Sequence, residues 1–216
     1  MDEKKIYQDI VSFFENEGLR IRETEIEELQ HDHKIDSTAY EQEGVFIPRT
    51  KKGYFRSVDN KEENKRRYTH ELGHGIFCEN FELGSRLSEL DEEVFHLGQK
   101  IYGQVPREGF VSVPANINGS YLIDQKTAEF IAGEEIQGAE KYFLVQKDLL
   151  SEYLDARNEL SEFYNKNLQL MEGFSIACEA QIVENLLLDK RPKYQVEGYE
   201  SFSGLNFQQI LAFLNR

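Results

Sequence analysis

The chain has 216 residues, of which 40 are acidic and 25 are basic, giving a formal net charge of −15 at pH 7. This charge argues against a nucleic-acid partner and against adhesion to an anionic membrane, because both would repel the protein. The composition, 39% hydrophobic and 12% aromatic, is typical of a globular protein. The sequence contains no evident signal peptide and no apolar window of membrane-spanning length, so we expect a cytoplasmic protein.

The N-terminal segment has the periodicity of a helix. Apolar residues at Ile6, Ile10 and Phe14 predict a helix near 3–17, which Gly18 would end. The alternation over 19–23 is consistent with a short strand, whereas the acidic stretch that follows it favours neither state.

A β-hairpin is predicted next. Its arms are 45–47 and 54–58, and its turn is 49–53. Pro48 confines the first arm to the edge of a sheet or to its own end, because proline cannot donate to a ladder. Such an edge could bind an extended peptide by strand addition, or the hairpin could simply cover the core.

The most informative stretch is His70-Glu71-Leu72-Gly73-His74, within a helix predicted at about 61–79 and capped by Asp59 or Asn60. Two histidines four residues apart project from one face of a helix and can bind a single zinc ion. Glu71 lies off that face, where its carboxylate can take the proton of a zinc-activated water. Gly73 and Gly75 each weaken a helix by about 1 kcal/mol, which indicates either the close approach of another backbone or simple tolerance of the cost.

The rest of the chain is expected to be mostly helical. A helix starts near Ser88 or one turn earlier and ends at Gly103, and 103–123 is either a lid or a connector. Residues 124–190 are predicted to form three helices with breaks near 133–138 and 158–167, and a last helix covers about 205–215. Cys78 and Cys178 are expected to be buried free thiols.

A catalytic zinc site needs a third protein ligand, and the histidine and cysteine patterns do not supply one. Glu172 and Glu179 are the best acidic candidates. They are seven residues apart, so they share a helix face, and the surrounding residues are largely apolar. Two carboxylates on a buried helix are costly unless they are paired or bind a metal, and the spacing alone leaves both open as the third ligand.

The motif at His70–His74 together with Glu172-Gly173-Phe174-Ser175 resembles the gluzincin zinc metallopeptidases, most closely their aminopeptidase branch. The resemblance implies His70, His74 and Glu172 as zinc ligands, Glu71 as the general base, and Glu179 in support. The Glu179-Ala180 pair is also similar to the ligand helix of regulatory metallopeptidases that cleave repressors, which makes Glu179 the alternative ligand.

These observations predict a zinc-dependent metallopeptidase that hydrolyses peptide or protein substrates. His96, Tyr164, Tyr194 and Tyr199 are candidates for stabilising the oxyanion. The alternatives are a catalytically silent, zinc-stabilised peptide-binding protein on the same scaffold, or a regulatory site-specific metallopeptidase.

The expected fold is α+β: a mainly helical, zincin-like domain with a small N-terminal hairpin or sheet. We expect a single domain over 1–216, in which 1–123 holds the sheet, the motif helix and the loop. The helical part, 124–216, would supply the third ligand.

Overall fold

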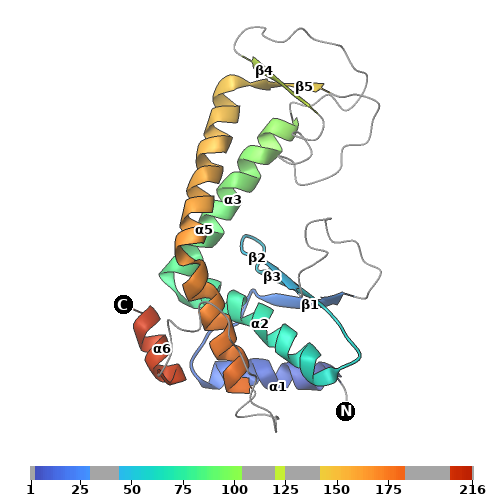
Figure 1. Ribbon diagram of the computed structural model, residues 1–216, viewed down its shortest axis with the longest axis vertical. Coiled ribbons are helices and arrows are strands. Elements are labelled where there is room, and N and C mark those ends of the chain that lie inside the picture. The colour runs from blue at the N-terminus through green and yellow to red at the C-terminus, as the bar shows by residue number, and fades with distance from the viewer. Residues whose placement is uncertain (1–2, 30–43, 104–119, 125–141, 183–204, 216) are drawn as a thin grey trace. The chain divides into compact units, whose positions relative to one another are not determined.

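A computed structural model describes residues 3–29, 44–103, 120–124, 142–182 and 205–215. The described part is mainly helical with a small three-stranded sheet, as predicted (Figure 1). In chain order the elements are α1 (Glu3–Asn16), β1 (Glu25–Leu29), β2 (Gly44–Ile47), β3 (Lys52–Arg56), α2 (Lys61–Asn80), α3 (Glu82–Gly103), β4 (Ser120–Asp124), β5 (Tyr142–Gln146), α5 (Lys147–Ile182) and α6 (Phe207–Leu214).

The chain divides into two compact units. The first comprises Met1–Ser88 and Tyr164–Arg216, and the second comprises Glu89–Phe163. The first unit contains the sheet, α2 and the C-terminal part of α5. The second contains the larger part of α3, the β4–β5 pair and the N-terminal part of α5. The single-domain interpretation stays a prediction.

The three-stranded sheet has the order β1-β3-β2. β2 and β3 pair antiparallel, with Val45 opposite Tyr54, which confirms the predicted hairpin. Lys51 closes its turn with a positive φ of 53°. The first strand is β1, parallel to β3, and it lies in the acidic stretch and not at 19–23. Lys52 explains this placement in part, because its ammonium pairs across the ladder with Glu25.

The motif helix α2 packs on the sheet and begins where predicted. The Asn60 side chain accepts hydrogen bonds from the backbone N–H groups of Glu62 and Glu63, which caps the helix. Both glycines have close neighbours, but only at Gly73 is the neighbour backbone, as predicted; at Gly75 it is a side chain. A Cβ at Gly73 would lie 2.7 Å from the Ser175 Cα atom on α5. A Cβ at Gly75 would lie 2.2 Å from the Thr24 side chain.

Aromatic side chains form the core where α2, α5 and α6 meet. The Phe174 ring packs on Phe77, Phe81 and Phe207 with centroids 5.3–6.1 Å apart. Phe14 of α1 contacts Phe207 from the other side. Phe14, Phe77 and Phe174 are fully buried. This core holds α5 against the motif helix, which decides which acidic residues reach the histidines.

Three predictions about the later elements are wrong. The helix predicted to start near Ser88 or one turn earlier starts earlier still, at Glu82, directly after Phe81, whose extended backbone ends α2. The break predicted at 158–167 is absent, because α5 runs through it without proline or glycine until Gly173. A strand, β5, stands within the region predicted to be entirely helical, and its residues are aromatic or aliphatic over 142–145, which suits a strand. The possible lid at 103–123 lies largely outside the described residues.

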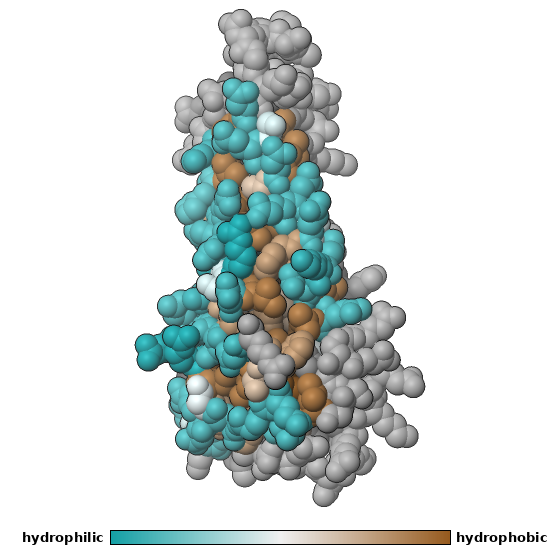
Figure 2. All heavy atoms as spheres, turned by 90° about the vertical axis from the view of Figure 1, so that its left-hand side faces the viewer, coloured by the Kyte–Doolittle hydropathy of each residue, from teal (hydrophilic) through white to brown (hydrophobic). Residues whose placement is uncertain are grey.

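On the face shown in Figure 2, the described side chains are largely hydrophilic, with hydrophobic ones gathered between them. Within the described ranges, the exposed large hydrophobic residues are Val58, Phe95, Leu154, Tyr164, Leu205 and Phe213. Cys78 and Cys178 are buried free thiols, as predicted. Among the helices described, none is both long and apolar enough to cross a membrane.

Candidate metal centre

His70 and His74 lie one turn apart on α2 and turn the same ring nitrogen toward each other. Their Nε2 atoms are 3.2 Å apart, and the ring centroids are 4.9 Å apart. A four-residue step along an α-helix rises about 6 Å and turns about 40° beyond a full circle, so both rings project from one face. His74 is buried and His70 is partly exposed. The spacing of the motif therefore produces two converging nitrogen donors.

Glu172 brings a carboxylate to the same point from α5. Its Oε2 atom lies 3.3 Å from His70 Nε2, and its Oε1 atom lies 3.6 Å from His74 Nε2. In a tetrahedral zinc site with bonds of about 2.0–2.1 Å, neighbouring donor atoms are about 3.3–3.4 Å apart. The three side chains thus bring possible ligand atoms close enough together to hold one metal ion. They are the one group of three possible ligands found within the described ranges.

Glu179 contacts the other nitrogen of His70. Its Oε1 atom lies 2.6 Å from His70 Nδ1, and its side chain is 1% exposed. A carboxylate that accepts the Nδ1–H bond fixes the tautomer in which Nε2 keeps its lone pair for a metal. The structure therefore brings both acidic candidates to His70, with Glu172 on the side of the converging donors and Glu179 behind the ring.

Charges around the histidines are strongly coupled. Burial opposes protonation of His70, but hydrogen bonds to Glu172 and Glu179 outweigh it and raise the pKa of that imidazole to about 10. Burial and the neighbouring His70 charge lower the pKa of His74 to about 4. Although burial opposes it, the hydrogen bond to His70 lowers the pKa of Glu172. A cation bound here would replace the proton on His70 Nε2, which faces Glu172.

Glu71 takes part in none of the contacts among the three possible ligands. Its side chain is buried beneath the hairpin, and a Cβ at Gly44 would lie 2.2 Å from its Oε1 atom. Its Oε2 atom has no hydrogen-bond partner within the described part of the chain. Burial raises the pKa of this carboxyl to about 7. Glycine at position 44 therefore leaves the space that the carboxylate occupies.

Of the four predicted oxyanion stabilisers, Tyr164 has a pKa that is affected by the charges of Glu172 and Glu71. It lies on α5 in the same unit as the donors, and burial together with the charges of Glu172 and Glu71 raises the pKa of its phenol. His96 is 64% exposed at its side chain and pairs with Glu92 at 2.7 Å. Tyr194 and Tyr199 lie outside the described residues.

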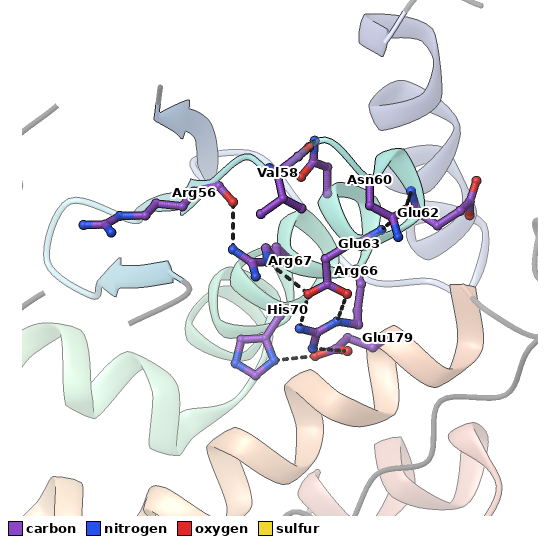
Figure 3. A network of polar contacts seen from close by, with 10 residues as sticks. Arg56, Val58, Asn60, Glu62, Glu63, Arg66, Arg67, His70 and Glu179 are labelled. Carbon is purple, nitrogen blue, oxygen red and sulfur yellow. Dashed lines mark hydrogen bonds and ion pairs between the residues drawn. The ribbon is translucent and has the colours of Figure 1, made fainter. Parts of the chain in front are cut away.

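Two features of the centre were not predicted from the sequence. One is the contact of Glu71 with strand β2, which depends on the pairing of the sheet. The other is an ion-pair network behind His70, shown in Figure 3, that includes Glu63, Arg66 and Glu179. The signal in the sequence that could have revealed this network is the spacing of Glu63, Arg66 and His70 at positions i, i+3 and i+7, which places them on one helix face.

No known protein family matches the chain, and no curated protein or solved structure matches it either. The candidate function therefore depends on the residues and the geometry of the centre itself.

Proposed function

We propose that the chain is a zinc-dependent metallopeptidase of the gluzincin type with a zincin-like first unit. The observation that carries the proposal is the convergence of His70, His74 and Glu172: the two Nε2 atoms are 3.2 Å apart, and the two carboxylate oxygens lie 3.3 Å and 3.6 Å from them. Glu71, adjacent in sequence to the first ligand, keeps a carboxylate that belongs to none of these contacts. Two imidazoles, one ligating acid and one separate acid are the parts that metal-assisted hydrolysis requires.

Each residue has a defined role in the proposed reaction. Zinc held by the three donors supplies Lewis-acid chemistry, polarising the scissile carbonyl and making a water molecule more acidic. Glu71 accepts the proton of the attacking water and delivers it to the leaving amine nitrogen as the C–N bond breaks. The hydroxyl of Tyr164 donates a hydrogen bond to the carbonyl oxygen as negative charge develops on it.

The proposed substrate is a peptide or protein segment in extended conformation. β2 pairs on one side with β3, and its Phe46 ring lies beside His74, with ring centroids 6.1 Å apart. A peptide added alongside β2 would therefore pass close to the donors. The net charge of −15 favours neutral or basic peptides and disfavours nucleic acids, and a cytoplasmic location remains our expectation.

The test is cleavage of a mixed peptide library by the full chain, followed by mass spectrometry. We expect cleavage that a zinc chelator abolishes and added zinc restores. Glu71→Gln should bind one zinc per chain yet cleave at least about 10³-fold more slowly, because the base is lost while the donors remain. Glu152→Gln, the same change at an exposed position of α5, is the matched control and should retain full activity. Full activity of Glu71→Gln would contradict the role of Glu71 as the general base.

A further inference from the structure

The carboxylate behind His70 is held at both of its oxygens. Glu179 Oε1 contacts His70 Nδ1 at 2.6 Å, whereas Oε2 contacts Arg66 Nη1 at 3.2 Å. The Glu179 side chain is only 1% exposed, so water cannot replace either partner. A buried carboxylate that loses one charged partner is strongly destabilised or reorients. The position of Glu179 at His70 therefore depends on what holds its second oxygen.

Arg66 is itself fixed by a fork of hydrogen bonds. Its Nη2 atom lies 2.6 Å from Glu63 Oε1, and its Nε atom lies 2.9 Å from Glu63 Oε2. The third nitrogen, Nη1, is the one that reaches Glu179 (Figure 3). A planar guanidinium can satisfy two carboxylates in this way, and the ammonium of a lysine cannot reproduce its geometry. Arg66 thus orients the carboxylate of Glu179 with respect to that of Glu63.

The network continues to the sheet. Arg67 Nε donates to Glu63 Oε1 at 3.0 Å, and Arg67 Nη1 donates to the Arg56 carbonyl at 3.0 Å. These bonds connect the end of β3 to Glu63, and through Arg66 to Glu179 on α5. The chain of contacts joins the three elements that surround the metal centre.

We propose that Arg66 is a positioning residue of the metal centre: it orients Glu179, which in turn presents the Nε2 lone pair of His70 to the metal. The inference depends on the proposed zinc site and deepens it, because it names a residue that sets metal affinity without touching the metal. Replacement of such supporting groups typically weakens metal binding by about 10–100-fold.

The experiment measures zinc affinity of the full chain by competition with a chromophoric chelator. We expect the zinc dissociation constant to rise about 10-fold in Arg66→Lys and about 100-fold in Arg66→Gln. Arg157→Lys, the same conservative change at an exposed position of α5, is the control and should bind zinc as the parent does. If Arg66→Gln does not fold, the lysine variant decides the result.

A second readout separates positioning from a purely structural role. With cobalt(II) in place of zinc, the visible absorption bands report ligand geometry, and they should shift in Arg66→Lys. Thermal unfolding in excess chelator reports the stability of the metal-free chain. If the folded variants have the zinc affinity and cobalt bands of the parent, Arg66 is not a positioning residue, whether or not the metal-free stability is lower. That result would not contradict the proposed zinc site. Failure of the parent chain to bind zinc would overturn both.

Discussion

At the centre of the site, the Nε2 atoms of His70 and His74 and the carboxylate of Glu172 face one another. His74 Nε2 lies 3.2 Å from His70 Nε2 and 3.6 Å from Glu172 Oε1. One metal ion could be bound by all three side chains. This arrangement is the basis for our proposal that they are ligands and that Glu179 supports His70.

This assignment of the two acids can be tested by matched amide substitutions. Glu172→Gln should weaken zinc binding by more than 100-fold because a ligand is lost. Glu179→Gln should weaken it by about 10–100-fold, as expected for a group that orients a ligand. Competition with a chelator measures the zinc dissociation constant of each variant and shows which substitution weakens zinc binding more. The opposite order would make Glu179 the third ligand.

Tyr164 is our proposed donor to the oxyanion. We expect Tyr164→Phe to lower kcat by about 10²-fold with little change in KM, because the hydrogen bond forms mainly in the transition state. Steady-state kinetics on a cleaved library peptide measure both constants. Tyr153→Phe, the same change at a buried position of α5, is the control. A change confined to KM would contradict the assignment.

Much of the candidate site follows from sequence spacing. The His70–His74 spacing fixes two donors on a helix face, and the seven-residue interval between Glu172 and Glu179 places both acids on one face of α5. Which acid meets which ring nitrogen could not be predicted, because it depends on how α5 packs on α2. That packing is set by long-range contacts such as Phe174 with Phe77.

The packing of α2 on α5 depends on the small residue at Gly73. A Cβ there would lie 2.7 Å from the Ser175 Cα atom, which is backbone and cannot rotate away. We expect Gly73→Ala to lower the free energy of unfolding by about 1–3 kcal/mol, although alanine favours a helix by about 1 kcal/mol.

Chemical denaturation measures this loss, and Asn158→Ala at an exposed helical position should be neutral or slightly stabilising. We also expect weaker zinc binding in Gly73→Ala, since Glu172 would move with α5. An unchanged free energy of unfolding in Gly73→Ala would contradict this prediction, because it would show that α2 and α5 can move apart without loss of stability.

The first half of α2 carries a pH-sensitive contribution to stability. Hydrogen bonds from Arg66, and then from Arg67, lower the pKa of Glu63 from 4.5 to about 2. Its stabilising contribution is therefore complete above about pH 4.5 and is lost as the pH falls toward about 2.

Glu63→Gln should flatten the dependence of unfolding free energy on pH between these values, and the two proteins should converge near pH 2. Denaturant titrations at a series of pH values test this, with Glu15→Gln at an exposed position of α1 as the control. Parallel curves for the parent and Glu63→Gln would contradict the lowered pKa.

Elements with local determinants were predicted well, and those fixed by distant contacts were not. Asn60 and the acidic first turn define the start of α2, and a short turn defines the β2–β3 hairpin. β1 was misplaced because its parallel pairing with β3 is a long-range contact. The asparagines at 158 and 167 suggested a break in α5, but asparagine only weakly disfavours a helix.

Considered as a whole, the chain gathers every residue of the proposed centre in its first compact unit. That unit draws its donors from two segments almost a hundred residues apart, and Glu89–Phe163 forms the second unit between them. A metal that binds groups so distant in sequence stabilises the folded state only, because the unfolded chain has no preformed site. Zinc should therefore be part of the stability of this protein as well as of its chemistry.

The most direct test is a crystal structure of the zinc-loaded chain with an anomalous difference map collected at the zinc absorption edge. We expect one peak at about 2.0–2.2 Å from His70 Nε2, His74 Nε2 and a carboxylate oxygen of Glu172. Glu179 should remain at His70 Nδ1, outside the coordination sphere. A map without a peak between the two rings, or a zinc ion bound by Glu179 in place of Glu172, would contradict this expectation.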